Sequence, residues 1–113
     1  TQGSPLYKKV LETSKTWNYA HRLMYVVGAN KAEYFKEIRS IVPNNFLVVP
    51  GVGAQGGSLQ EVCKFGLNKD IGLLINSSRG IIYASSESDF SEKAAVEAKK
   101  LQLEMKQILE NHF

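Results

Sequence analysis

The sequence predicts an α/β fold with a parallel sheet, because three apolar, β-rich runs alternate with helical patterns. The runs are LMYVVG at 23–28, FLVVP at 46–50 and IGLLIN at 71–76, and they recur at a spacing of about 25 residues. Runs that are apolar throughout are typical of parallel strands buried on both faces. Strand–helix alternation favours right-handed βαβ units, so the sheet is either a small open one or part of a larger barrel.

The first two helices are expected at 4–17 and 30–41. Ser4 can cap the first helix and Pro5 fits its first helical position, while Asn30 can cap the second. The expected inward sides are Leu6, Val10, Leu11 and Trp17 on the first helix, and Phe35, Ile38 and Ile41 on the second. The outward side of the second helix is expected to be mostly charged, with Lys31, Glu33, Lys36, Glu37 and Arg39.

Two further helices are expected at 58–66 and 91–111. Ser58 with Glu61 three residues later has the pattern of a capping box, which marks the start of a helix. The long last helix carries an apolar stripe whose members are spaced 4, 3, 4 and 3 residues apart, namely Ala94, Ala98, Leu101, Met105 and Ile108. The predicted order is therefore αβαβαβα, in a single segment over residues 1–113.

Composition and charge exclude several classes of function. The 113 residues include 14 basic and 11 acidic side chains, which gives a net charge of +3. The basic residues are scattered, so no nucleic-acid partner is expected. No apolar stretch approaches the roughly 20 residues that span a membrane, and no signal peptide is recognisable, so no membrane association is expected either.

Cysteine and histidine offer no metal chemistry in this sequence. Cys63 is the single cysteine, which excludes an intrachain disulfide and favours a reducing compartment such as the cytoplasm. It is expected to be a small core residue, although a reactive thiol is the alternative. His21 and His112 are far apart in the sequence and are expected in solvent, so no metal is predicted.

Two loops at strand ends predict an anion-binding site. GVGAQGG at 51–57 follows the second expected strand, and SSRG at 77–80 follows the third. The carboxyl ends of parallel strands meet at one rim, so the loops should be adjacent if their strands are neighbours. Glycines let backbone N–H groups converge on an anion, and the helix that begins at Ser58 adds a favourable dipole.

The side chains of these loops suit a phosphate group. Arg79 supplies a planar, permanently charged fork, and Gln55 supplies an amide donor from the opposite loop. Ser77 and Ser78 add hydroxyl and N–H groups. Two simpler interpretations remain: the glycines could serve tight turns only, and Arg79 could be a surface charge.

The glycine pattern is not a dinucleotide-binding fingerprint. Gly51, Gly53 and Gly56 match G-x-G-x-x-G, but the next expected strand ends in Asn76 rather than in an acidic residue. The loop also lacks the Gly-Lys-Ser/Thr sequence of a P-loop.

The two loop motifs resemble those of orotidine 5'-phosphate decarboxylase, in the branch that includes many bacterial and some protozoan enzymes. The resemblance rests on PGVGAQGG at 50–57 and INSSRGIIYA at 75–84. The upstream stretch VVGANKAEYFKEIRSIVP at 26–43, with its Ile38-Arg39 pair, is similar to the same branch. The likeness extends from about residue 5 to residue 85.

The resemblance implies a (β/α)8 (TIM) barrel of which this chain forms the C-terminal segment. Its strands would be the sixth, seventh and eighth, and 91–111 would be the closing helix. The residues that match the family's phosphate-binding positions are Gln55 and Arg79 through their side chains, and Ser78 and Gly53 through the backbone. Pro50 would lie against the pyrimidine, with Gly51 beside it.

The implied reaction converts orotidine 5'-monophosphate to uridine 5'-monophosphate and CO2 in pyrimidine synthesis, without a metal or cofactor. The family uses an alternating Lys-Asp array, read as D-x-K-x-x-D, to stabilise a carbanion at C6 and to deliver a proton. This sequence has only Asp70 and Asp89, and neither has that spacing. No catalytic residue is therefore expected here, and the chain should be inactive without the N-terminal half of the barrel.

The start at TQGSP lacks an initiator Met and indicates a fragment, produced by cleavage, by expression of a half-barrel or by truncation. Two exposed sheet edges would make the fragment prone to association, so it is expected to be held by the rest of the barrel. The resemblance also implies a homodimer. The alternatives are a standalone phosphate- or nucleotide-binding module, or another phosphate-handling barrel enzyme such as one of tryptophan or histidine synthesis.

Overall fold

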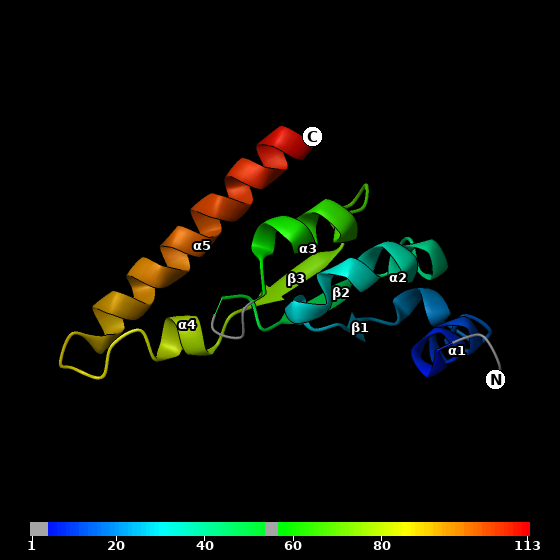
Figure 1. Cartoon of the computed structure of the whole chain (residues 1–113), viewed down its shortest axis with the longest axis horizontal. Helices are drawn as coiled ribbons and strands as arrows, with labels where there is room; N and C mark the ends of the chain where they lie inside the picture. The colour runs from blue at the N-terminus through cyan, green and yellow to red at the C-terminus, as the bar shows by residue number, and fades with distance from the viewer. Residues whose placement is uncertain (1–4, 54–56) are drawn as a thin grey trace.

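The structure is a computed structural model that describes residues 5–53 and 57–113. Its three strands are β1 (Tyr25–Val26), β2 (Leu47–Pro50) and β3 (Leu73–Asn76), which form a parallel sheet in the order β1-β2-β3 (Figure 1). The predicted parallel α/β fold is confirmed. The strands that precede the two candidate loops, β2 and β3, are neighbours as the site prediction requires.

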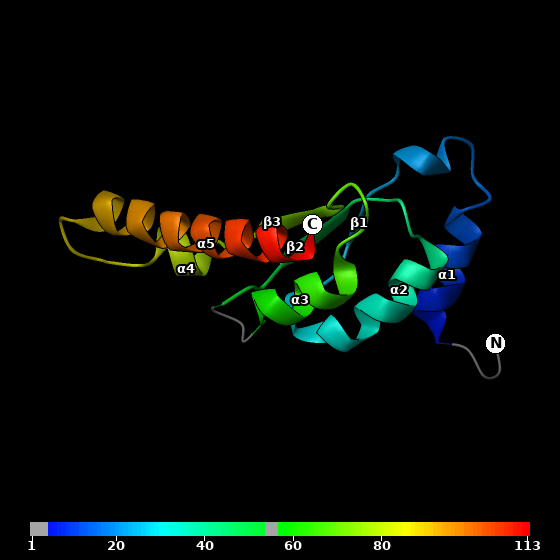
Figure 2. The same ribbon diagram turned by 90° about the horizontal axis from the view of Figure 1, so that it is seen from above.

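The described part of the chain has five α-helices: α1 (Leu6–Ser14), α2 (Phe35–Ile41), α3 (Leu59–Gly66), α4 (Arg79–Ile82) and α5 (Phe90–His112). Helices α2 and α3 lie side by side on one face of the sheet, with α1 beside α2 (Figure 2). Helix α5 runs obliquely past α3, and its predicted stripe is its half-buried side. The predicted order αβαβαβα holds, with the short α4 added before α5. None of these helices combines the length and the apolar character needed to cross a membrane.

The core lies between the sheet and helices α2 and α3. Phe35 from α2, Val62 from α3 and the β2 residues Leu47 and Val49 are all completely buried there. The opposite face of the sheet is different. Val26 and Leu74 are 72% and 47% exposed, and both are in register with Val48 between them. The prediction that the strands are buried on both faces is therefore wrong for this chain alone.

The region around β1 departs most from the predicted boundaries. Strand β1 has two residues instead of the six expected at 23–28, and α1 ends at Ser14 instead of 17, with Pro5 just before its first turn rather than inside it. Leu6, Val10 and Trp17, expected inward, are 79%, 53% and 54% exposed. Leu6 and Val10 line an apolar groove of about 690 Å³ between α1 and β1, which stays open because β1 is an edge strand. Trp17 lies after the end of α1 and outside this groove.

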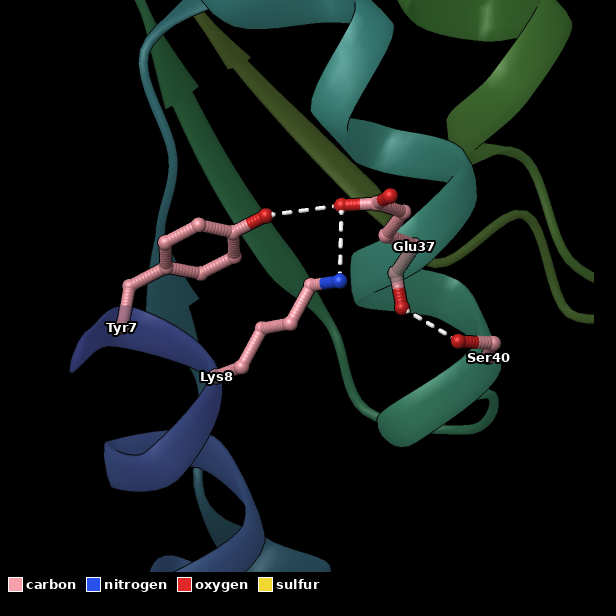
Figure 3. Close-up of polar contacts among 4 residues, drawn as sticks. All are labelled: Tyr7, Lys8, Glu37 and Ser40. Atoms are coloured by element: carbon pink, nitrogen blue, oxygen red, sulfur yellow. Dashed lines mark hydrogen bonds and ion pairs between the residues drawn. The ribbon is translucent and has the colours of Figure 1, made fainter. Parts of the chain in front are cut away.

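Helix α1 is held against α2 by a polar contact at the surface (Figure 3). Tyr7 Oη donates to Glu37 Oε2 over 2.9 Å, and Lys8 Nζ lies 3.1 Å from the same oxygen. Lys8, and then the Tyr7 hydroxyl, hold the pKa of Glu37 below its usual range. The Ser40 hydroxyl donates to the Glu37 carbonyl on the same helix (Figure 3).

The helix predicted at 30–41 is divided in two. A 3₁₀ turn over Ala29–Tyr34 precedes α2, and its cap is Gly28 without any side-chain bond, so the prediction that Asn30 caps a continuous helix is wrong. Non-helical dihedral angles at Lys31, φ −112° and ψ 35°, interrupt the 3₁₀ segment itself. Ala29 and Ala32 are buried, so the conformation of this segment is set by its packing against neighbouring segments and not by helix propensity.

Helix α3 begins as predicted. Ser58 Oγ accepts a hydrogen bond from the Glu61 N–H over 3.3 Å, which is the first half of a capping box. Strand β3 begins later than predicted, at Leu73. Ile71 and Gly72 have positive φ values of 76° and 73°, so they form a turn with Asn68 before the strand begins.

Arg39, predicted on the outer surface of α2, is half-buried below the amino ends of the strands. Its Nε donates to the Gly66 carbonyl over 2.6 Å, and its Nη2 donates to the Gly72 carbonyl over 2.9 Å. Its Nη1 donates to the carbonyls of Asn45, over 2.6 Å, and Val42, over 3.1 Å. Burial lowers the pKa of this guanidinium. The prediction of an outward Arg39 is therefore wrong, because its long side chain folds back over the helix end to reach these carbonyls.

Two asparagines complete this network. Asn45 Nδ2 donates to the carbonyls of Ala20 and Leu23, which lie just before β1. Asn68 Nδ2 donates to the Pro43 carbonyl, in the connection before β2. Side chains thus tie together the segments that lead into all three strands.

Candidate phosphate-binding site

The loop after β2 closes on itself through glycine backbone. Gly51 and Gly53 have φ values of 91° and 85°, which residues with a Cβ rarely adopt. The Gly53 N–H donates to the Gly57 carbonyl over 3.0 Å, and the Gly57 N–H donates to the Gly51 carbonyl over 3.2 Å. Glycine is therefore needed at Gly51 and Gly53 for the turn itself, whatever the loop binds.

Gly57 brings the loop against the segment that follows β1. A Cβ at this position would lie 2.3 Å from the Ala29 Cβ and 2.7 Å from the Gly51 carbonyl oxygen. No side chain fits there without movement of the backbone. This close approach places the loops after β1 and β2 in direct contact.

The loop after β3 contacts the loop after β2. Ser77 Oγ donates to the Val52 carbonyl over 3.3 Å, and Ser78 Oγ donates to Asn76 Oδ1 over 3.0 Å. The prediction that the two motifs lie side by side is confirmed by the first of these contacts. All three strands thus have their following loops in one group at the carboxyl edge of the sheet.

Arg79 is exposed at this edge. It is the first residue of α4, a short helix at a position where a loop was expected, and the Ser78 carbonyl accepts from the N–H groups of Ile81 and Ile82. Within residues 5–53 and 57–113, the Arg79 guanidinium has no hydrogen-bond or ion-pair partner. Its donors are therefore free to bind an anion, in contrast to those of Arg39.

The structure groups five of the six residues predicted at the site. Pro50 ends β2 and is followed by Gly51 and Gly53 in the β2 loop, while Ser78 lies in the β3 loop just before Arg79, the first residue of α4. Gln55 lies outside the described residues. The Gly53 N–H is already bonded to Gly57, while no described atom lies within 4 Å of the place where a Gly53 Cβ would stand.

Sequence reasoning missed how the segment after β1 contributes. Ala29 is 1% exposed and supports the β2 loop through Gly57. The small-residue pair Gly28-Ala29 at the end of the first apolar run was the available signal, since small residues permit such a close approach of backbones.

No arrangement of three or more His, Cys, Asp or Glu side chains suited to a metal ion occurs in the described part of the chain. Cys63 is buried on α3 as expected, and burial raises the pKa of its thiol, so it lacks the thiolate character of a reactive cysteine. His21 and His112 are exposed as expected.

Fold and candidate site together define a segment of a parallel α/β protein whose two motif-bearing loops follow adjacent strands. No protein-family model matches the chain. It is 65% identical over 113 residues to the orotidine 5'-phosphate decarboxylase of Flavobacterium johnsoniae, covering 100% of this chain and 41% of that protein. It is 63% identical over 110 residues to the same enzyme of Christiangramia forsetii, covering 97% of this chain and 40% of that protein.

Solved structures agree with the sequence comparison. The chain superposes on Leishmania donovani UMP synthase with a TM-score of 0.76 and 33% identity, covering 96% of this chain and 23% of that one. It superposes on Leishmania donovani OMP decarboxylase with a TM-score of 0.73 and 31% identity, and the match covers 96% of this chain and 40% of that one. The predicted resemblance is confirmed: the chain corresponds to a segment of orotidine 5'-phosphate decarboxylases and spans about two fifths of the length of the curated relatives it matches.

Proposed function

We propose that this chain is the phosphate-binding part of an orotidine 5'-phosphate decarboxylase, a carboxy-lyase that converts orotidine 5'-monophosphate to uridine 5'-monophosphate and CO2. The observation that carries the proposal is the Ser77–Val52 contact, which joins the two motif-bearing loops beside the free guanidinium of Arg79. The names of the sequence relatives support the same reaction.

In this proposal Arg79 binds the substrate phosphate with two parallel N–H donors. Gln55, matched to the family motif, supplies an amide donor from the β2 loop. Ser78 and Gly53 lie near the phosphate, and Pro50 with Gly51 borders the pyrimidine. Binding energy gained at the phosphate holds the reacting ring in place, which lowers the barrier for chemistry at a distance from these residues.

The chemical step belongs to residues outside this sequence, since the sequence has no D-x-K-x-x-D. The exposed face of the sheet, with Val26 and Leu74, fits the interior of a closed barrel, where such side chains are packed in layers. The open groove between α1 and β1 fits further elements of the same barrel, which would pack beside the edge strand β1. We therefore propose that the chain acts only together with the remaining strands, as part of a homodimer in the cytoplasm.

The test uses a grafted barrel, in which this chain replaces the matching 113 residues of the Flavobacterium johnsoniae enzyme. Arg79→Ala should raise KM for orotidine 5'-monophosphate about 10- to 100-fold, as expected for the loss of a charge-assisted contact worth roughly 1.5–3 kcal/mol. Arg22→Ala is the matched control, because Arg22 is exposed beside Tyr19 before β1. An unchanged KM in Arg79→Ala would contradict the proposal.

A contiguous buried core favours a second candidate, a phosphate- or nucleotide-binding module that folds without further strands. Purification of the 113-residue chain distinguishes the two candidates. A folded monomer that binds uridine 5'-monophosphate in calorimetry supports the module. An unfolded or aggregated chain supports the barrel segment.

A further inference from the structure

One side-chain hydrogen bond joins the β2 and β3 loops within residues 5–53 and 57–113. Ser77 Oγ, on a half-buried residue, is the donor, and the Val52 carbonyl is the acceptor. Val52 is 6% exposed and lies between the two glycines with positive φ. The bonds within the β2 loop use the carbonyls of Gly51 and Gly57, which leaves the Val52 carbonyl for Ser77.

Ser77 also lies close to the start of α4. A Cβ added to Gly80 would lie 3.0 Å from Ser77 Oγ, so this hydroxyl is near the first turn of α4. Arg79 begins that turn, two residues after Ser77. The Ser77–Val52 bond therefore links the β2 loop to the segment that leads directly into Arg79.

We propose that Ser77 is a positioning residue, whose hydroxyl sets the place of Arg79 relative to the Gly51–Gly53 turn and so sets the affinity for the substrate phosphate. This inference rests on the proposed function. Ser77 does not need to contact the substrate in this role, since it acts through Arg79. At 3.3 Å the bond exceeds the usual 2.5–3.0 Å of hydroxyl donors, so its removal should have a moderate effect.

The experiment compares Ser77→Ala and Ser77→Thr in the grafted barrel, with Ser88→Ala as an exposed control. Ser77→Ala should raise KM for orotidine 5'-monophosphate about 3- to 10-fold with little change in kcat, the size expected for one net hydrogen bond. Ser77→Thr keeps the hydroxyl and should restore KM to within about 2-fold of the parent.

A double-mutant cycle with Arg79→Ala separates positioning from general support of the fold. If Ser77 acts through Arg79, the effect of Ser77→Ala should fall below about 2-fold once the guanidinium is absent. An equal effect in both backgrounds overturns the proposal, as does a Ser77→Thr variant that behaves like Ser77→Ala. Failure of Ser77→Ala to fold at the assay temperature also overturns it, because Ser77 would then be structural.

The two proposals fail in different ways. If Arg79→Ala alone leaves KM unchanged, the phosphate assignment is wrong. If Arg79→Ala raises KM and Ser77→Ala does not, only the role of Ser77 is wrong.

Discussion

The two edges of the sheet use arginine in opposite ways. At the amino edge, Arg39 gives hydrogen bonds to four backbone carbonyls, and Asn45 and Asn68 add three more. At the carboxyl edge, Arg79 is exposed and has no partner within the described residues. Backbone hydrogen bonds between glycines and the hydroxyls of Ser77 and Ser78 hold its surroundings together.

We interpret this difference as a division between a stabilising edge and the edge that carries the proposed phosphate site. Donors used internally, like those of Arg39, fix the connections between strands and are unavailable to a ligand. Donors left free at the carboxyl ends of parallel strands are available for recognition, where ligands of α/β proteins bind. Substitutions at the amino edge should therefore change stability, and substitutions at the carboxyl edge should change substrate binding.

The largest loss of stability is expected for Arg39→Ala in the grafted barrel. The variant leaves the carbonyls of Asn45 and Gly66 without this donor, and the Gly72 carbonyl keeps only the Leu47 N–H, so the loss should be about 2–4 kcal/mol of unfolding free energy. Urea denaturation measures the loss, and KM of the folded protein should change less than 2-fold or so, because the site lies at the other edge.

Arg39→Lys is the matched control. It keeps the charge but cannot reach all of these carbonyls with one ammonium group, so its stability should be intermediate. A variant Arg39→Ala as stable as the parent would show that the amino-edge network is not a stabilising element.

Gly57→Ala should affect both stability and binding, since it lies where the loops after β1 and β2 touch. The added Cβ would stand 2.3 Å from the Ala29 Cβ, and such overpacking costs about 1–3 kcal/mol. Gly53→Ala is the comparison, because its surroundings are open and only its φ of 85° is unfavourable, at a cost of roughly 1–2 kcal/mol. Equal KM in Gly57→Ala and the parent would argue that this contact does not shape the site.

Ser58→Ala tests the helix that follows the glycine loop. Loss of the bond from the Glu61 N–H to Ser58 Oγ should cost about 1 kcal/mol, the typical value for an N-cap. Ser86→Ala, at an exposed position outside the helices, should leave the urea midpoint unchanged. A Ser58→Ala variant with the parent's midpoint would mean that water replaces the cap without cost.

The smallest effect is expected at a surface contact that belongs to neither edge. Because Lys8 and Tyr7 lower the pKa of Glu37 in the folded protein, the contact stabilises the protein at pH values above the ordinary glutamate pKa of about 4.3. The stabilisation is lost as the pH falls through the lowered pKa. The stability difference between the parent and Glu37→Gln, measured by urea denaturation, should therefore shrink on acidification. A difference that is constant with pH would contradict the ion pair.

The sequence predicted the carboxyl edge better than the amino edge. Gly51, Gly53 and Arg79 are residue types whose local chemistry indicates a turn and an anion-binding side chain, whatever their distant neighbours. Arg39 looked like one more charged residue on the outer side of a helix. The carbonyls that it binds come from Asn45, Gly66 and Gly72, and no local pattern shows that these converge.

What the sequence by itself determined is the parallel α/β order, the cap at Ser58, the stripe of α5 and the residue types of the site. Hydrophobic periodicity and the special dihedral angles of glycine are local properties, so they can be inferred before the chain is folded. The tertiary structure decided which face of the sheet is covered, where β1 and α1 end, and that Arg39 and Arg79 have opposite roles. These features depend on which segments become neighbours, because burial and hydrogen-bond partners arise from contacts between residues distant in the sequence.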